Sequence, residues 1–248
     1  MSFNNIKIIL EKNNYKFSHL KKTESTMLEA QRYLKKNLQN FAIISDIQTN
    51  GKGRRGNIWH SPKGNIYCSM SFKNFLEKDK FSLFNILIAI SIKMAFLKYD
   101  NKEIKFKWPN DIFFENKKFG GIIAENYELS NQNFIIVGFG INILTYPKLE
   151  KYETTCANEF SKVKNIPDFM KIFFQILFKN LKLLQKGELA KLINIYKKSL
   201  MFIGDIIEIQ TINKSIIKGK FIDINHDGSL KLKYNKNFLN IYNGTIKI

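Results

Sequence analysis

Residues 51–59 read Gly51-Lys52-Gly53-Arg54-Arg55-Gly56-Asn57-Ile58-Trp59, and the rest of the chain is best understood outward from them. Three glycines in six positions let the backbone bend tightly and approach a ligand closely. Two of the chain's three arginines, Arg54 and Arg55, lie here, although nearly every other cation is lysine. Planar guanidinium groups bind carboxylates and phosphates in a bidentate manner, which a lysine amine does not. The stretch predicts a loop that folds over an anionic ligand, with a plain surface hairpin as the alternative.

The glycine spacing by itself is ambiguous. Gly51, Gly53 and Gly56 match the dinucleotide-binding fingerprint by letter, but that fingerprint needs a helix directly after it to receive the pyrophosphate. Residues 57–62, Asn-Ile-Trp-His-Ser-Pro, do not begin such a helix. No Gly-Lys-Ser/Thr follows at the distance that a phosphate-binding P-loop requires. Both nucleotide motifs are therefore excluded.

Length and composition indicate one substantial domain, or one domain with a small appendage. The chain has 248 residues, of which 44% are hydrophobic, so it can bury a sizeable core. No apolar run approaches the roughly 18 residues of a membrane span, and no signal peptide opens the chain. We expect a soluble cytoplasmic protein without a membrane partner. Cys68 and Cys156 have no metal-ligand neighbours in the sequence, and both are expected to be free thiols.

The net charge of +19 leaves two interpretations open. A basic nucleic-acid-binding protein would carry such a charge. Drift in composition would produce it as well, and the lysines are spread along the chain rather than collected in one arm. We expect no DNA partner. The positive field should instead speed the encounter with an acidic partner.

Hydrophobic periodicity predicts a mixture of helices and strands over residues 1–200, a domain boundary near residue 200, and a small barrel over 201–248. Thr26 and Glu29 form a capping-box pattern at the start of the first helix. Residues 144–166 are polar and irregular and form a candidate mobile loop. From Gly204 onward, short β-rich runs alternate with turns. The expected helices are 26–38, 82–99, 167–186 and 188–200, and the expected strands are 15–20, 41–47, 65–72, 104–107, 112–115, 119–127 and 134–139.

A second motif, Lys107-Trp108-Pro109-Asn110-Asp111, places a cation and a carboxylate at the two ends of a non-helical turn. Lys118 follows seven residues after Asp111, directly before a Gly120-Gly121 pair that predicts a bulge or a close approach to the backbone. The three histidines, His19, His60 and His226, are scattered along the chain. Their spacing matches neither a metal-binding motif nor a catalytic triad. Together with Arg54, these motifs indicate a site that binds anionic groups such as phosphates. Such a site fits the activation of a carboxylate by ATP.

In their order and spacing, the motifs resemble the biotin–protein ligase family. That family shows Gly-Arg-Gly-Arg-x-Gly-Arg-x-Trp, then Lys-Trp-Pro-Asn-Asp, Lys-x-x-Gly-Ile and Gly-x-Gly-Ile-Asn. This chain shows residues 51–59, Lys107–Asp111, Lys118–Ile122 and Gly138–Asn142. The resemblance runs from about Ser25 to Gly228. It implies an α/β, class II synthetase-like catalytic domain over residues 1–200, with a mixed sheet flanked by helices, and an SH3-like barrel over 201–248. It also implies a ligase-only member, because residues 1–22 leave no room for the DNA-binding domain of bifunctional relatives.

The resemblance implies a two-step reaction. Biotin's carboxylate attacks the α-phosphate of ATP, delivered with Mg²⁺, and forms biotinyl-5′-AMP. One lysine of a biotin carboxyl carrier protein, the acetyl-CoA carboxylase subunit, then takes the biotin. No resident metal is expected, with Mg²⁺ near Asp111 at most, and the chain is expected to be a monomer or a homodimer.

The resemblance also assigns roles to residues. Ser25, Thr26 and Gln48 match positions that bind biotin's ureido group. Asp111 would orient or deprotonate the incoming amine, and Lys107 would support that step. The implied biotin-binding residues are Ser25, Thr26, Met27, Gln48, Gly51, Lys52, Gly53, Arg54, Trp59, Lys118, Gly120 and Gly121. The implied ATP and adenylate contacts are Arg54, Arg55, Asn57, Lys118 and Asn142, and the implied catalytic residues are Arg54, Lys118, Asp111 and Lys107.

Three positions depart from the family pattern. Met27 stands where the family usually has Asn, and it removes one ureido contact. Lys52 and Asn57 each replace an Arg of the loop, and Asn57 removes a phosphate contact that Arg55 would have to supply. The alternative activity is a lipoate or octanoate ligase on the related fold. Gln48 with Ser25-Thr26 favours biotin, because these side chains suit a polar ureido ring better than an aliphatic tail.

Overall fold

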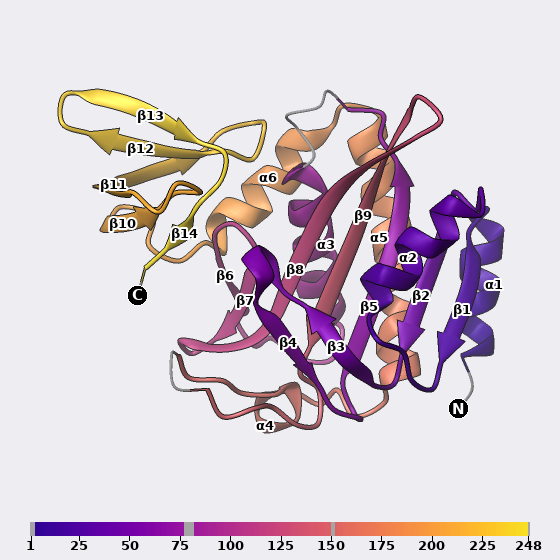
Figure 1. Cartoon of the computed structure of the whole chain (residues 1–248). Coiled ribbons are helices and arrows are strands. Elements are labelled where there is room, and N and C mark those ends of the chain that lie inside the picture. The colour runs from indigo at the N-terminus through magenta and orange to yellow at the C-terminus, as the bar shows by residue number, and fades with distance from the viewer. Residues whose placement is uncertain (1–2, 77–81, 150–151, 248) are drawn as a thin grey trace.

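The computed structural model describes residues 3–76, 82–149 and 152–247 (Figure 1). Within these residues the largest sheet has seven strands in the order β1-β2-β5-β9-β8-β7-β6. β1 and β2 run parallel, and every other neighbouring pair is antiparallel. The predicted mixed sheet is therefore confirmed. Its strands are β1 (Lys16–Leu20), β2 (Phe41–Ser45), β5 (Ile66–Lys73), β9 (Gln132–Ile141), β8 (Lys117–Leu129), β7 (Asp111–Phe114) and β6 (Lys105–Lys107).

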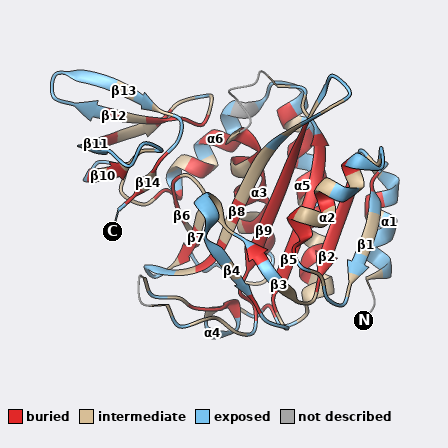
Figure 2. Ribbon diagram, in the orientation of Figure 1, coloured by how far each residue is buried: buried red, intermediate tan, exposed pale blue. Residues whose placement is uncertain are grey.

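Helices cover both faces of this sheet. On one face, α3 (Ser82–Phe96) packs between the sheet and the pair α5 (Ile166–Gln185) and α6 (Leu189–Lys198). α3 is apolar on nearly all sides because neighbours surround it, and it is among the most buried elements (Figure 2). α2 (Thr26–Lys35) covers part of the opposite face and closes a smaller core. The rest of that face is left open for a site.

The C-terminal strands form a separate five-stranded antiparallel sheet in the order β13-β12-β11-β10-β14. Its buried side chains, among them Ile209 and Phe221, join the same core cluster as α3 and α5. Trp108 Nε1 also donates a hydrogen bond to Gly228 O at 3.1 Å. The SH3-like topology and the division at residue 200 stay predictions. The strands are β10 (Ile206–Gln210), β11 (Ile216–Ile224), β12 (Leu230–Tyr234), β13 (Asn237–Ile241) and β14 (Thr245–Ile246).

The structure differs from the expected elements in three places. An amphipathic helix, α1 (Asn4–Lys12), was not anticipated; it buries Ile6 and Leu10 beside β1 and α5. The predicted capping box is wrong, because Ser25 is the N-cap of α2 and the Thr26 hydroxyl bonds Gln48 instead. The expected irregular loop contains a short helix, α4 (Ala157–Phe160).

The glycine-rich stretch forms a two-stranded hairpin that stands apart from the main sheet. β3 (Gln48–Lys52) and β4 (Ile58–Ser61) pair antiparallel, and a 3₁₀ turn, Arg54–Gly56, joins them. The predicted bulge beside Gly120 is confirmed, since the register passes from Ile112↔Gly120 to Phe113↔Lys118 and leaves Phe119 as the extra residue. No helix in the described ranges is long and apolar enough to cross a membrane.

Candidate functional site

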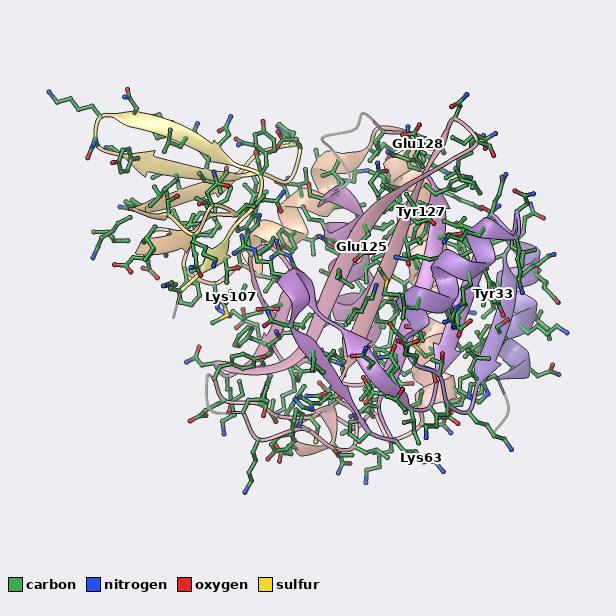
Figure 3. All side chains as sticks on the ribbon, in the orientation of Figure 1. Tyr33, Lys63, Lys107, Glu125, Tyr127 and Glu128 are labelled. Carbon is green, nitrogen blue, oxygen red and sulfur yellow. The ribbon has the colours of Figure 1, made fainter. Side chains whose placement is uncertain are left out.

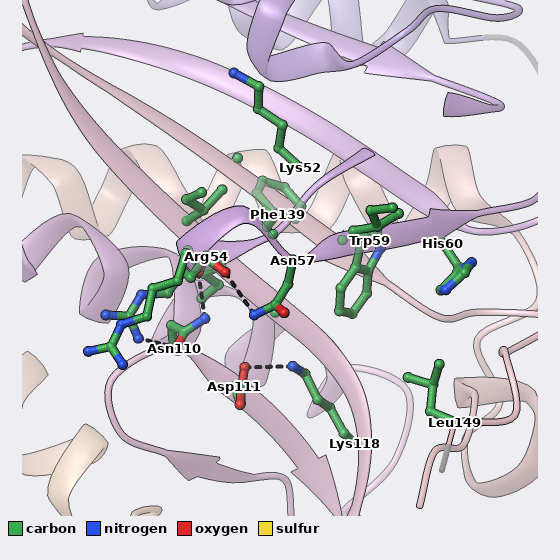
Figure 4. A pocket seen from close by; sticks show the side chains of 18 of the residues that line it. Lys52, Arg54, Asn57, Trp59, His60, Asn110, Asp111, Lys118, Phe139 and Leu149 are labelled. Atoms are coloured by element: carbon green, nitrogen blue, oxygen red, sulfur yellow. Dashed lines mark hydrogen bonds and ion pairs between the residues drawn. The ribbon is translucent and has the colours of Figure 1, made fainter. Parts of the chain in front are cut away.

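A cavity of about 990 Å³ lies on the open face of the main sheet. It is bounded by the start of α2, the β3–β4 hairpin, strands β8 and β9, the turn at 108–111 and the edge of the small sheet (Figure 4). Segments distant in the sequence therefore meet at one place. The residues implied by the resemblance that line the cavity are Thr26, Met27, Gln48, Lys52, Gly53, Arg54, Arg55, Asn57, Trp59, Lys107, Asp111, Lys118 and Gly121.

Four of the implied residues do not line this cavity. Ser25 is fully buried next to it, and its Oγ has no hydrogen-bond partner among the described residues. Asn142 lines a small neighbouring pocket and its Oδ1 is likewise unpartnered. Gly120 faces Ile112, because a Cβ there would lie 3.1 Å from Ile112 Cδ1. Gly51 faces the Ser61 hydroxyl instead of the cavity. The role of Gly120 in approaching biotin finds no support in this geometry.

Trp59 anchors the hairpin onto the main sheet. Its indole packs on Gly140 of β9 and Gly121 of β8; a Cβ on Gly140 would overlap the ring, and one on Gly121 would lie 3.2 Å from Cζ3. The indole Nε1 is buried without a partner in the described structure. Gly121 and Gly140 therefore leave space for the Trp59 indole, which forms part of the cavity wall. Of the two alternatives posed from the sequence, a hairpin is what the structure shows; that it folds over an anionic ligand stays a prediction.

The turn of the hairpin is closed by its own residues. Arg55 has φ 56° and Gly56 has φ 77°, both in the left-handed region that glycine enters most easily. Asn57 Nδ2 donates to Arg54 O at 2.9 Å, and Gly53 N donates to Asn57 O at 2.8 Å (Figure 4). The short amide at position 57 thus caps the turn, which accounts structurally for its presence there.

The two loop arginines tie the hairpin to other parts of the molecule. Arg54 donates to Asn110 Oδ1 at 3.0 Å, to Gly244 O at 3.3 Å and to Asn243 Oδ1 at 3.4 Å. Arg55 donates to Gln210 O at 3.3 and 3.4 Å. The small C-terminal sheet therefore helps to hold the cavity wall. No sequence motif predicted these contacts of Arg54 and Arg55.

Charged side chains of β6, β7 and β8 form a largely buried cluster close to the turn of the hairpin. Lys118 Nζ and Asp111 Oδ1 form an ion pair at 2.8 Å, and the two side chains are 12% and 18% exposed (Figure 4). Lys118 Nζ also lies 5.5 Å from the Trp59 ring centroid and 5.0 Å from that of Tyr152. Lys107 lies on β6 (Figure 3). It is 8% exposed. The register places Lys107 directly across from Asp111, so the carboxylate that is ion-paired with Lys118 also has Lys107 as its cross-strand neighbour.

The charge imbalance shows in the pKa values. Burial lowers the pKa of Lys107 below its ordinary 10.5; Asp111 opposes the shift and Lys118 adds to it. Burial also lowers the pKa of Arg54, Arg55 lowers it further, and Asp111 opposes. We call the part of the cavity around Arg54, Lys107, Asp111 and Lys118 its cationic end. Among the described residues, the cavity as a whole is lined by one carboxylate, Asp111, and by six cations: Lys52, Arg54, Arg55, Lys107, Lys118 and Lys148.

The other end of the cavity is neutral and hydrogen-bonded. Gln48 Oε1 accepts from the Thr26 backbone N–H at 2.7 Å and from the Thr26 hydroxyl at 3.0 Å. Met27 closes this end, and its Sδ would lie 2.6 Å from a Cβ on Gly138. Thus Met27 occupies the space above a glycine instead of offering an amide. This end suits a compact polar ring, and the cationic end suits phosphate and carboxylate groups.

Sequence reasoning missed several residues of the site. Asn110 stands inside a motif that was singled out, yet its link to Arg54 depends on the fold. No sequence motif indicated a role in the site for Tyr152, or for Gln210 and Asn243 in the C-terminal part of the chain. Among the described residues, no group of three or more His, Cys, Asp or Glu side chains is placed to hold a metal ion.

Residues 17–142, about half of the chain, match the Biotin/lipoate A/B protein ligase family. The chain belongs to this family. Bifunctional ligase/repressor BirA of Bacillus subtilis is 24% identical over 213 residues, which are 83% of this chain and 65% of that protein. Biotin–protein ligase 2 of Arabidopsis thaliana is 30% identical over 126 residues, 48% of this chain and 36% of that protein. The family member described here thus spans less than two thirds of the length of these relatives.

Solved structures of biotin protein ligases share the fold. The Aquifex aeolicus enzyme in complex with biotin and ATP has a TM-score of 0.77 at 23% identity, over 93% of this chain and 97% of that one. The Leishmania major enzyme in complex with biotinyl-5-AMP has a TM-score of 0.61 at 22% identity, over 91% and 98%. The expected fold class, a mixed sheet flanked by helices, is confirmed by these likenesses.

Proposed function

We propose that this family member is a biotin–protein ligase that activates biotin with ATP and transfers it to a lysine of a biotin carboxyl carrier protein. One observation carries the proposal: the same cavity is lined by the hydrogen-bonded pair Gln48 and Thr26 and, among the described residues, by six cations and one carboxylate. A compact polar ring with an acidic tail fits from one end, and a triphosphate fits at the other. The names of the relatives point the same way.

In the first step, a carboxylate oxygen of biotin attacks the α-phosphorus of ATP. The bond to the β-phosphate oxygen breaks, pyrophosphate leaves with the electron pair, and an acyl-adenylate remains. Two anions must approach each other, and their repulsion is large in a site shielded from water. Lys118, Lys107 and Arg54 lie at the cationic end of the cavity. The nearby carboxylate does not neutralise all three of these cations. We assign them to the attacking carboxylate and the reacting phosphoryl group.

In the second step, the carrier lysine amine attacks the acyl carbon. An amide bond forms, the amine loses a proton, and AMP leaves. Asp111 is the one carboxylate lining the cavity in the described structure, and Lys118 holds its Oδ1 at 2.8 Å. We propose that Asp111 orients the amine and receives its proton once ligand phosphate has competed for Lys118.

The adenylate must stay in place between the two steps. Arg54 spans the cavity wall from the hairpin to Asn110 and to the small sheet. We propose that Arg54 retains the intermediate. The Arg54→Gly variant should release adenylate and give diffuse biotinylation of bystander proteins, detected on a streptavidin blot. Labelling confined to the carrier, as in the wild type, would refute this role.

Mg²⁺ would neutralise phosphate charge in the activation step. The described residues lack a cluster that would hold a resident metal, and the Asp111 carboxylate is already paired with Lys118. We therefore propose that Mg²⁺ arrives bound to the ATP phosphates. We further propose that the protein acts in the cytoplasm, with the acidic surface of the carrier attracted by the net charge of +19.

The family name includes lipoate ligases, so a lipoate or octanoate ligase is the alternative. Gln48 and Thr26 would be left facing an aliphatic ring or tail, at the cost of unpaired polar groups. The deciding experiment is ATP–pyrophosphate exchange with biotin, lipoate or octanoate as the acid. We expect exchange with biotin to exceed the other two by at least about 100-fold. Faster exchange with lipoate or octanoate would overturn the proposed function.

A further inference from the structure

Two serines that no motif includes flank the neutral end of the cavity. Ser69 on β5 is fully buried, and its Oγ lies 2.8 Å from Thr26 Oγ1. Ser61 at the end of β4 is 6% exposed. Its Oγ lies 2.9 Å from Gln48 Nε2 and 2.8 Å from Trp59 O. The four side chains therefore form a continuous hydrogen-bonded chain that begins inside the main sheet and ends at the hairpin.

Donor and acceptor chemistry determines the direction of this chain. The Thr26 backbone N–H can only donate, so the Gln48 atom 2.7 Å from it is the oxygen Oε1. The amide nitrogen of Gln48 then faces Ser61 and must donate to it. Ser61 in turn donates to Trp59 O, which can only accept. At the other end, the Thr26 hydroxyl donates to Gln48, and it therefore accepts from Ser69.

The order of donors leaves a defined set of groups for a ligand. Both lone-pair positions of Gln48 Oε1 are used by Thr26. One Nε2 hydrogen of Gln48 and one lone pair of the Thr26 hydroxyl remain unused, and both residues line the cavity. Hence the ligand must present an acceptor and a donor side by side. A cyclic urea does so, with a carbonyl flanked by N–H groups, whereas a dithiolane ring or an alkyl tail offers neither.

We propose that Ser61 and Ser69 are positioning residues that hold Gln48 and Thr26 in the one orientation complementary to a cyclic urea. They thereby select acids with a ureido ring over acids with an apolar ring or tail. The proposal rests on the proposed biotin ligase function. Without Ser61 the Gln48 amide keeps its two bonds from Thr26 but loses the acceptor that holds its Nε2 group. Without Ser69 the Thr26 hydroxyl is no longer committed to donating to Gln48.

The chain offers a matched control on the same strand. Ser71 lies two residues beyond Ser69 on β5, so it points to the same face of the sheet, and it is also fully buried. Its hydroxyl bonds Gln39 O, a backbone group of another loop, and Ser71 does not line the cavity. If buried serines on β5 matter only for packing, Ser69→Ala and Ser71→Ala should have equal effects on ligand binding.

The experiment measures ligand affinity and steady-state kinetics in the full-length chain. Biotin and ATP affinities of the wild type, Ser61→Ala, Ser69→Ala and Ser71→Ala are measured by calorimetry. KM and kcat are measured by ATP–pyrophosphate exchange with biotin and with lipoate. We expect Ser61→Ala and Ser69→Ala to raise Kd and KM for biotin about tenfold, with little change in kcat or in the KM for ATP. The preference for biotin over lipoate should fall by a similar factor, and Ser61→Thr should restore it.

Each outcome bears on the proposal. Unchanged biotin affinity in both Ser61→Ala and Ser69→Ala would overturn it, and so would an equal loss in Ser71→Ala. If Ser69→Ala unfolds, Ser61→Ala decides, because Ser61 lies on the two-stranded hairpin outside the main sheet. A wild-type protein that binds ATP but not biotin would instead overturn the proposed function itself, a failure visible before any variant is made.

Discussion

The two ends of the cavity are built on opposite principles. At the neutral end, Gln48 and Thr26 already satisfy each other, and buried serines determine the direction of their hydrogen bonds. At the cationic end, Lys118 forms an ion pair with Asp111, and Lys107 is the cross-strand neighbour of the same carboxylate. Burial lowers the pKa of Lys107. The neutral end keeps one donor and one acceptor unused, and the cationic end lacks negative charge. In the proposed function, the neutral end provides selectivity for the acid and the cationic end favours its activation.

The largest expected effect lies at the cationic end. Lys118→Ala removes a buried cation beside the reacting groups, and we expect the rate of biotin-dependent ATP–pyrophosphate exchange to fall about 100- to 1,000-fold. The neighbouring Lys117→Ala is the matched control, since Lys117 is exposed and its partner is Glu153 at 3.8 Å. A Lys118→Ala enzyme as fast as Lys117→Ala would remove Lys118 from the chemistry.

Gln48→Glu tests the neutral end. A carboxylate at position 48 can still accept from Thr26, but it replaces the Nε2 donor with an acceptor. We expect the KM for biotin to rise about 10- to 100-fold, while the KM for ATP changes less than threefold. The test compares the change in the KM for biotin with the change in the KM for ATP. A comparable rise in both would show that the two ends do not work independently.

The pH dependence of ATP binding separates the ends further. Lys107 has a pKa lowered by burial, so it loses its proton as pH rises through a window that ends at its ordinary value of 10.5. ATP affinity should weaken several-fold across this window, and Lys107→Met should abolish that step. Biotin affinity should change less. Because the folded state binds this proton more weakly than the unfolded state, Lys107 should also make the free energy of unfolding increase with pH there. A wild-type ATP titration that coincides with that of Lys107→Met would count against the assignment.

The smallest effect is expected at the turn of the hairpin. Asn57→Ala removes the hydrogen bond from Nδ2 to Arg54 O, which should loosen the turn by about 0.5–1 kcal/mol. Amide hydrogen exchange over residues 53–57 should speed up about two- to fivefold, with exchange at Gln48 unchanged. Asn57→Ser, which keeps a short polar side chain, is the control. Protection that is the same in Asn57→Ala and the wild type would show that Asn57 does not cap the turn.

Much of the site was predictable because its parts are local. Glycines with paired arginines, a Trp-Pro turn bounded by charges, and a lysine before two glycines each express a local backbone or charge requirement. Their order along the chain was enough to indicate the family and the fold class. Gly120 shows the limit of this reasoning. The glycine pair was expected to approach a ligand, but successive residues of a strand face opposite sides, so only Gly121 lines the cavity.

Other features could be decided only by the tertiary structure. The Thr26 hydroxyl was expected to cap its own helix, yet Gln48 and Ser69, far apart in the sequence, lie close enough to bind it. The contacts of Arg54 with Asn110 and Gly244 likewise join segments separated by 56 and 190 positions. The sequence by itself determined which chemical groups this protein carries and which turns and strands present them. The fold determined which groups meet, because a hydrogen bond or ion pair depends on distances of about 3 Å that no local pattern encodes.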